Sequence, residues 1–372
     1  MNTINPFVLV GYKSPEYFCD RKKESTSIIS AIDNQRNMTL VSLRRMGKTG
    51  LIHHVFHQLK KRPDLQLIYL DIFPTTCLND FIKALSKSIL EVQKPKSTIT
   101  DKLLKLLSHL RPKIAFDTIT GQPTLELDVR DTREAENTLE GLFNYLNSEN
   151  KKTVLAIDEF QQIVQYPEKN MESMLRSLIQ KYHHIQCLFS GSQKNMLLSM
   201  FQDQNRPFYQ STQMMGLDKI ESDLYKSFIV KKFEADNQNI NKDLLDKILD
   251  WTRGHTYYVQ YFCNRLYSLH KQKITMAHIH EIASQIIDEN VMVYNNYLKL
   301  LTRQQTNLLK AIAKEQIVTQ PTAKDFLFTH QLGAASTVKT TLDALVKKDF
   351  VTSDQTGYFI VDVFFSRWLQ NL

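Results

Sequence analysis

A segment of eight residues, SLRRMGKT at 42–49, constrains the fold of this chain more than any other feature. It follows a short apolar run typical of a strand, Met38–Val41, and it precedes a helix-like run, Leu51–Leu59. A strand, a tight turn containing Gly-Lys-Thr and a helix together predict a loop whose backbone N–H groups converge on a phosphate. In such a loop the lysine contacts the β- and γ-phosphates, and the threonine hydroxyl is a ligand of Mg²⁺. The sequence therefore predicts a site for a nucleoside triphosphate.

The loop departs from the usual GxxxxGK[ST] pattern at one position, because Ser42 stands where the first glycine is expected. Serine adopts a positive φ less readily than glycine, so this position raises a question about nucleotide affinity. The alternative interpretation of Gly-Lys-Thr is an ordinary helix N-terminus with an exposed lysine, and the two loop arginines could simply face solvent. We assign the following loop residues to the nucleotide: Arg44, Arg45, Met46, Gly47, Lys48, Thr49 and Gly50.

Three further apolar runs have the composition of buried strands, at residues 66–73, 153–157 and 185–189. The first of them is followed by Leu78–Val92, where apolar residues recur at helical spacing. Alternating strands and helices predict an α/β fold, a parallel sheet with helices on both faces. Residues 110–130 interrupt the alternation with two strand-like pieces around a turn. We expect an inserted β-hairpin there, either as a decorated loop or as a contact for a partner.

Polar residues follow two of these strands, at the edge of the sheet where ligands of open α/β folds bind. Asp158 and Glu159 come directly after the run at 153–157. We expect Asp158, together with Thr49, to hold Mg²⁺, directly or through water, and Glu159 to polarise the attacking water. An acidic helix N-terminus is the alternative interpretation of this pair. Ser192 and Gln193 follow the next strand and are expected at the same edge.

Fast phosphoryl transfer usually also needs an arginine that offsets charge in the transition state. Outside the loop the chain offers Arg176, Arg206 and Arg253. Arg206 lies in the segment NRPFY, between a helix and the return of the chain to the core, from where it could reach a neighbouring subunit. We select Arg206 as the catalytic candidate, although a single arginine is more often an ordinary surface residue.

Helical periods dominate after Leu217, over residues 221–234, 243–252, 257–271 and 276–300. A capping-box pattern, Thr302 with Gln305, then opens a set of three helices, and residues 350–361 read as two short strands. This order predicts three domains: a nucleotide-binding α/β domain at 1–216, a helical lid at 217–296 and a winged helix at 297–372. Lys339 is the candidate contact if the third helix of the winged helix enters a DNA groove, and contact with a protein is the alternative.

Composition limits the class of protein further. A chain of 372 residues exceeds the usual size of one core, and 42% hydrophobic with 23% charged residues is ordinary for a globular protein. A formal charge of +8 favours acidic partners, but only weakly over so long a chain. The sequence shows no signal peptide and no membrane-spanning stretch, so we expect a cytoplasmic protein with no membrane association. The four cysteines lack CxxC spacing and predict neither a zinc site nor disulfides.

Together these segments resemble the AAA+ ATPases of the signal-transduction class that contains the archaeal-type predicted ATPases. The resemblance covers nearly the whole chain: YFCDR at 17–21, NMTLVSLRRMGKTGLI at 37–52, AIDEFQQI at 156–163, FSGSQ at 189–193, RPFY at 206–209, GHTYYVQ at 254–260 and the terminal winged helix. It implies that the nucleotide is ATP and that Mg²⁺ accompanies it.

The resemblance also implies roles for residues outside the loop. Arg21 falls in the entry segment that flanks the nucleotide base, and Ser192 or Gln193 falls where a first sensor residue reads the γ-phosphate. His255 falls where the helical lid meets the nucleotide. A surface amide and a helix cap are the alternative interpretations of Gln193 and His255. The chain departs from the family pattern at Thr256, which replaces the proline common after Gly-His.

The leading hypothesis is a Mg²⁺-dependent ATPase that works as a conformational switch. It would act on a macromolecular partner, DNA or another protein, through its winged helix. A homo-oligomer is compatible with the expected position of Arg206. The alternative is a DNA-binding regulator in which the nucleotide is a structural ligand and is not hydrolysed. A small-molecule kinase ranks last because the sequence shows no acceptor motif.

Overall fold

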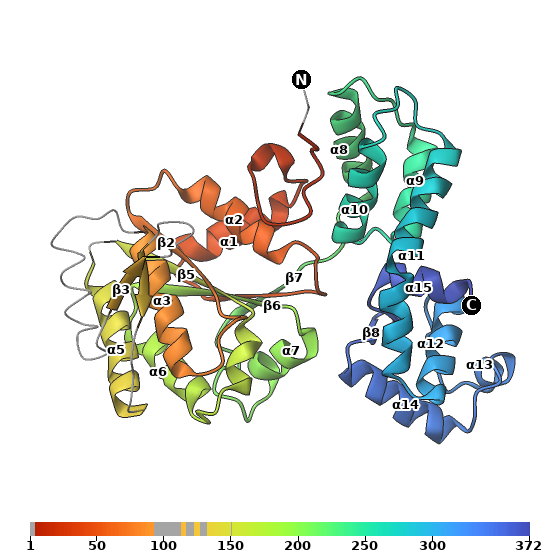
Figure 1. Ribbon diagram of the computed structural model, residues 1–372. Helices are drawn as coiled ribbons and strands as arrows, with labels where there is room; N and C mark the ends of the chain where they lie inside the picture. The colour runs from red at the N-terminus through yellow and green to blue at the C-terminus, as the bar shows by residue number, and fades with distance from the viewer. Residues whose placement is uncertain (1–3, 93–112, 117–122, 127–131, 150) are drawn as a thin grey trace. The chain divides into compact units, whose positions relative to one another are not determined.

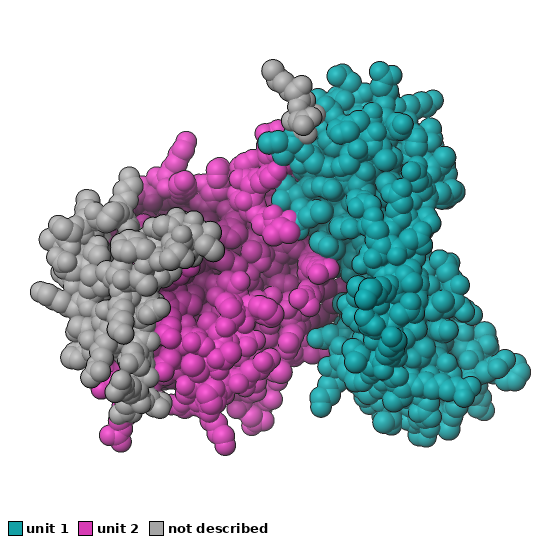
Figure 2. All heavy atoms as spheres, viewed as in Figure 1, with its two compact units in different colours: residues 1–9, 219–372 teal, residues 10–218 magenta. Residues whose placement is uncertain are grey.

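The computed structural model describes residues 4–92, 113–116, 123–126, 132–149 and 151–372. The chain divides into two compact units, Val10–Asp218 and Lys219–Leu372, and Met1–Leu9 belongs with the second unit (Figure 2). The sequence-based boundary at 216/217 falls close to the division between the units. The expected boundary between lid and winged helix, at 296/297, lies inside the second unit and stays a prediction.

The first unit is built on a five-stranded parallel sheet with the strand order β2-β5-β6-β1-β7. Its strands are β1 (Met38–Val41), β2 (Leu65–Asp71), β5 (Lys152–Asp158), β6 (Ile185–Gly191) and β7 (Gln213–Gly216). The expected parallel α/β sheet is confirmed. β7 is not predicted from the sequence. It is a four-residue edge strand that carries little apolar signal and, within the described ranges, pairs with β1 alone.

Helices cover both faces of this sheet (Figure 1). α1 and α2 share one core with Leu40 and Val154, whereas α3, α5, α6 and α7 share the other core with Leu155 and Phe189. Val154 and Leu155 fall in different cores because successive residues of a strand point to opposite faces. The helices are α1 (Lys22–Asp33), α2 (Lys48–Leu59), α3 (Leu78–Val92), α5 (Thr132–Ser148), α6 (Met171–Lys181) and α7 (Lys194–Gln202).

Two short strands in the region expected to hold a hairpin form a sheet of their own. β3 (Lys113–Phe116) pairs antiparallel with β4 (Pro123–Glu126), with Phe116 opposite Pro123. The expected turn around Thr120, Gly121 and Gln122 lies outside the described residues. These strands are separate from the main sheet, so they leave its parallel strand order uninterrupted.

Four helices open the second unit: α8 (Ser222–Glu234), α9 (Lys242–Trp251), α10 (Thr256–Tyr267) and α11 (Met276–Lys299). They match the four helical stretches of the sequence analysis to within a few residues. Phe7 packs its buried ring against Phe233 and Tyr267, at centroid distances of 5.5 and 5.9 Å. This contact explains why the start of the chain belongs with these helices, whereas the sequence-based boundaries assign it to the nucleotide-binding domain.

A winged helix completes the second unit. Its elements are α12 (Arg303–Glu315), α13 (Lys324–Thr329), α14 (Ala335–Lys347), the antiparallel pair β8 (Val351–Asp354) and β9 (Gly357–Ile360), and α15 (Val363–Gln370). The capping box at Thr302 is present, because its hydroxyl accepts from the Gln305 N–H and its own N–H donates to the Gln305 side chain. The sequence analysis does not predict α15. Among the described residues, no helix has the length and apolar composition that spanning a membrane requires.

Candidate functional site

The loop between β1 and α2 has the backbone geometry expected of a phosphate cradle. Arg45 and Gly47 adopt left-handed conformations, with φ of 62° and 95°, and α2 begins at Lys48. Left-handed residues turn successive N–H groups toward a common centre. Ser42 is not among the residues with positive φ, so serine causes no backbone strain where the usual pattern has glycine.

Lys48 points into the loop and not into solvent. Its side chain is nearly buried, and its Nζ donates to the Ser42 Oγ at 3.0 Å, the Leu43 carbonyl at 3.1 Å and the Ser42 carbonyl at 3.4 Å. Burial lowers the pKa of Lys48 to about 8, while the charges of Glu159 and Asp158 act in the opposite direction. An ammonium held by three neutral oxygens can exchange them for phosphate oxygens, which carry the opposite charge. The interpretation as an exposed lysine is therefore wrong.

Asp158 ends β5 at the same edge of the sheet, and four donors surround its buried carboxylate. Oδ2 accepts from the Thr49 Oγ1 at 2.6 Å and from the Tyr69 hydroxyl at 2.8 Å. Oδ1 accepts from the Ser190 Oγ at 2.5 Å and from the Glu159 N–H at 3.0 Å. Mg²⁺ prefers oxygen ligands and takes one or two from protein beside phosphates and water. The Thr49 hydroxyl oxygen fits that requirement while the hydroxyl still donates to Asp158. Asp158 can hold the metal through water, or directly if it exchanges one of its four donors.

Glu159 follows Asp158 in a left-handed conformation, with φ of 57°, at the start of the 3-10 helix η3 (Phe160–Gln165). Its Oε2 accepts from the Gln161 Nε2 at 2.6 Å, the Ser192 Oγ at 2.7 Å and the Ser192 N–H at 3.2 Å. Gln193 follows as the half-buried residue that precedes α7. The structure thus brings the expected base and the expected sensor segment into direct contact.

Arg21 lies against the loop. It is nearly buried, adopts a left-handed conformation before α1, and donates to Glu24 at 2.8 Å and to the Met46 carbonyl at 3.5 Å. Met46 is itself buried, whereas Arg44 and Arg45 are exposed on the outer side of the loop. Gly50 sits in the first turn of α2, where an added Cβ would lie 3.4 Å from the Phe18 ring.

Arg206 is held inside its own unit. Its guanidinium pairs with Glu172, with a closest N···O distance of 2.6 Å, and both side chains are at most a quarter exposed. Burial raises the pKa of Glu172, and the charge of Arg206 acts in the opposite direction. In this conformation Arg206 is engaged with α6, so a catalytic role requires that it exchange Glu172 for phosphate. That role stays a prediction.

His255 belongs to the second unit, where it precedes α10. Its buried ring packs on Tyr258 at 4.8 Å and makes no side-chain capping hydrogen bond to the helix. Gly254 before it is left-handed, with φ of 62°. The approach of His255 to a nucleotide stays a prediction.

Two contacts of the site are missed by the sequence analysis. Tyr69 lies within an apolar strand, where no motif marks its hydroxyl as a partner of Asp158. Gln161 reaches toward β6, where an added Cβ at Gly191 would lie 1.9 Å from the Gln161 Oε1. Glycine at 191 therefore leaves room for the amide in this orientation.

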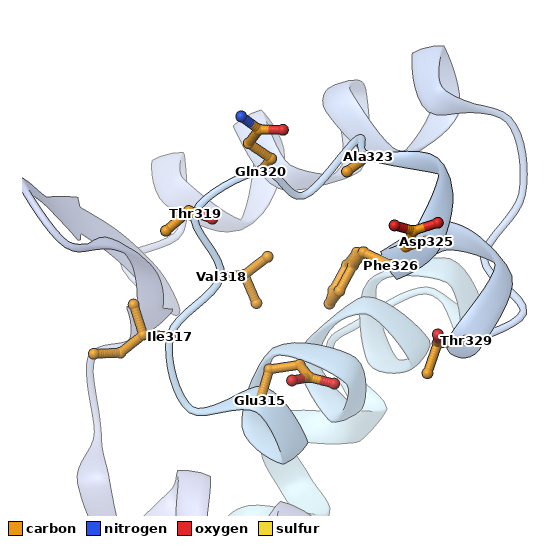
Figure 3. A pocket seen from close by; sticks show the side chains of 9 residues that line it. All are labelled: Glu315, Ile317, Val318, Thr319, Gln320, Ala323, Asp325, Phe326 and Thr329. Carbon is orange, nitrogen blue, oxygen red and sulfur yellow. The ribbon is translucent and has the colours of Figure 1, made fainter.

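A pocket of about 350 Å³ lies elsewhere, in the winged helix between the end of α12 and α13 (Figure 3). The carboxylates of Glu315 and Asp325 line it beside Val318 and Phe326. Two acidic side chains oppose the binding of a polyphosphate, so this pocket is not a second candidate for the nucleotide.

The parallel sheet, the loop at its edge and the paired Asp158 and Glu159 define a P-loop ATPase fold followed by a winged helix. The sequence matches the ATPase domain predominantly from Archaea over residues 18–262, and a probable winged helix domain over residues 292–371. The chain belongs to this family of archaeal-type ATPases, as the resemblance implies. A comparison with curated proteins gave no significant match.

Solved structures share the fold along nearly the whole chain. A Walker-type ATPase of Pyrococcus abyssi is 17% identical with a TM-score of 0.68, and the match covers 98% of this chain and 99% of the other. The ORC2 protein of Aeropyrum pernix, solved as ADPNP and ADP complexes, is 13% identical with a TM-score of 0.60 and coverage of 99% and 96%. The ORC1 protein of Aeropyrum pernix in complex with DNA is 10% identical, with a TM-score of 0.51 and coverage of 96% and 94%.

Proposed function

We propose that this protein binds ATP with Mg²⁺ in the loop 42–49 and hydrolyses its β–γ phosphoanhydride bond. The observation that carries the proposal is the arrangement around that loop. A buried Lys48 points into it, and Thr49 at its end contacts the carboxylate of Asp158. Membership in the family of archaeal-type ATPases supports the same reaction.

The reaction needs a water aligned with the γ-phosphorus and a group that accepts its proton. Glu159 is the carboxylate beside Asp158 that can serve. The water oxygen forms a bond to the γ-phosphorus, its proton passes to Glu159, and the bond from the γ-phosphorus to the bridging oxygen breaks with release of ADP. When bound, Mg²⁺ would offset part of the negative charge of the phosphates. Arg206, once released from Glu172, would add a further positive charge.

Hydrogen bonds hold the Glu159 carboxylate through one of its two oxygens. Ser192 and Gln161 donate three hydrogen bonds to its Oε2, and these bonds fix the direction of the carboxylate. A γ-phosphate that draws the Ser192 hydroxyl toward itself would remove one of these bonds and leave Glu159 free to accept from water. We infer that this segment senses the γ-phosphate by that exchange.

We further propose that the nucleotide works as a conformational switch for the second unit. Two arginines connect the winged helix to residues 250–255, the segment that ends at His255. Arg253 donates to the Ser366 Oγ at 2.8 Å, and Arg367 donates to the carbonyls of Trp251 and Asp250 at 2.9 and 2.8 Å. A nucleotide that moves His255 would therefore move the winged helix with it.

The partner of the winged helix is proposed to be DNA, with another protein as the alternative. The exposed face of α14 carries Lys339 and Lys347, which can contact phosphates. The related ORC1 structure contains DNA, and this supports testing DNA first. A homo-oligomer would give Arg206 access to a neighbouring site and is part of the proposal.

Two variants test the proposed reaction. Lys48→Ala should abolish ATP binding, because it removes the ammonium that faces the phosphates. Glu159→Gln should bind ATP as the wild type does and lose about 10²- to 10⁴-fold in turnover, the usual share of a general base. Calorimetry for binding and phosphate release for turnover give both values. Equal turnover by wild type and Glu159→Gln would refute the assigned base, and binding without any turnover in the wild type would favour a regulator with a structural nucleotide.

A further inference from the structure

Tyr69 contacts the candidate metal ligand from the neighbouring strand. β2 pairs with β5 in a register that sets Tyr69 opposite Ala156 and Asp71 opposite Asp158. From this position the phenol hydroxyl donates to the Asp158 Oδ2 at 2.8 Å. The His53 ring of α2 packs on the Tyr69 ring, with centroids 4.4 Å apart.

The Tyr69 hydroxyl occupies the second hydrogen-bonding position of Oδ2, beside the Thr49 hydroxyl. A carboxylate oxygen accepts about two hydrogen bonds, and on Oδ2 these come from Thr49 and Tyr69. Oδ1 is held in the same way by Ser190 and by the Glu159 N–H. With donors on both oxygens, the carboxylate cannot rotate without breaking hydrogen bonds.

We propose that Tyr69 is a positioning residue. Its hydroxyl holds the Asp158 carboxylate in the orientation in which Asp158 and Thr49 hold the Mg²⁺ that accompanies the nucleotide. The inference rests on the proposed function, because it assigns Thr49 and Asp158 to that metal. Groups that orient a metal ligand without touching the metal typically change metal affinity by roughly 10- to 100-fold when removed. A bond that merely joins two strands would not act on the metal at all.

The experiment compares ATP binding with and without Mg²⁺ by calorimetry. For each protein, the Kd in EDTA divided by the Kd in Mg²⁺ gives the enhancement by the metal. Tyr69→Phe keeps the ring and removes only the hydroxyl, and it should lower this ratio roughly 10-fold while the Kd in EDTA stays within about twofold. Tyr166→Phe is the matched control, because its hydroxyl bonds to Thr75 and not to Asp158. Its ratio should equal that of the wild type.

Each outcome decides between a role toward the metal and a role in the fold. An unchanged ratio in Tyr69→Phe overturns the inference, as does an equal loss of affinity with and without Mg²⁺. If the wild type binds no ATP in either buffer, the proposed function fails and the inference fails with it. If Tyr69→Phe does not fold, His53→Ala removes the ring on which Tyr69 packs. It should lower the ratio in the same direction as Tyr69→Phe, by less than roughly 10-fold because the hydroxyl itself remains, and an unchanged ratio would contradict the inference.

Discussion

Ser42 makes a contact in this loop that a glycine could not make. Its Oγ accepts from the Lys48 ammonium at 3.0 Å and donates to the Leu43 carbonyl at 2.9 Å. The serine that departs from the usual motif therefore contacts the lysine that we expect to face the phosphates. ATP has to replace this contact when it binds.

At this position we predict that Ser42→Gly binds ATP more tightly. Removal of one net hydrogen bond of about 1 kcal/mol from the free state should lower the Kd about fivefold. Ser42→Ala removes the same hydroxyl without the backbone freedom of glycine, so the two variants separate the two effects. Calorimetric titration with ATP measures both. Weaker binding by Ser42→Ala would show that the hydroxyl serves the bound state instead.

Residue patterns located the loop and the carboxylates, but not the residues that support them. Lys48, Thr49, Asp158 and Glu159 stand in short segments whose spacing follows from the chemistry of a phosphate site. Tyr69 reaches Asp158 only because β2 and β5 are neighbours in the sheet, and strand order is a tertiary property. No local pattern in the run at 66–73 carries that information.

At the scale of elements, strong periodic signals gave correct strands and helices, and short or terminal elements were missed. β5 is predicted well because it is buried over six of its seven residues and reads as a continuous apolar run. β7 has four half-buried or exposed residues and exists through its pairing with β1. α15 was missed because its eight residues directly follow the wing and include Phe364, Phe365 and Trp368, which suit a strand as well as a helix.

α15 also joins the winged helix to the end of α9, and this contact gives a prediction about stability. Arg367 donates to the carbonyls of Asp250 and Trp251 at the end of α9, where carbonyls lose their partners within the helix. The Asp250 carbonyl also accepts from the Arg253 N–H at 3.0 Å. Arg367→Met keeps most of the side-chain volume and loses both bonds. The free energy of unfolding should fall by about 1.5–3 kcal/mol.

Urea unfolding measures this loss, and Arg303→Met is the control, since Arg303 is exposed at the start of α12. The control should change the free energy of unfolding by less than about 0.5 kcal/mol. Equal losses of unfolding free energy in the two variants would show that the hydrogen bonds of Arg367 between α15 and α9 do not stabilise the protein. The proposed transmission from residues 250–255 to the winged helix would then lose its support.

For the whole molecule, the central issue is what the winged helix contacts. From Tyr297 to Leu372 the chain has nine basic and six acidic residues, a modest excess that neither requires nor excludes DNA. The acidic pocket beside α13 marks one part of the winged helix that phosphates would avoid. The exposed face of α14, which carries Lys339 and Lys347, suits contact with DNA phosphates better.

If DNA is the partner, its affinity should fall steeply with salt, because each phosphate contact releases a counterion. Lys339→Ala should weaken binding and reduce the slope of log affinity against log salt by about 1. Fluorescence anisotropy with duplex DNA, at several salt concentrations and with ATP or ADP present, measures the slope and its dependence on nucleotide. A slope unchanged by Lys339→Ala would remove α14 from the interface. Absence of binding at low salt would leave a protein as the partner.

The most direct test of nucleotide binding in this loop is a crystal structure with a non-hydrolysable ATP analogue and Mg²⁺. We predict that the phosphates lie inside the loop 42–49 and that the Lys48 ammonium contacts the β- and γ-phosphates in place of Ser42. We also predict Mg²⁺ beside Thr49 and Asp158. A nucleotide bound elsewhere, or a Lys48 that keeps its contacts with Ser42 and Leu43 while nucleotide is present, would contradict these predictions.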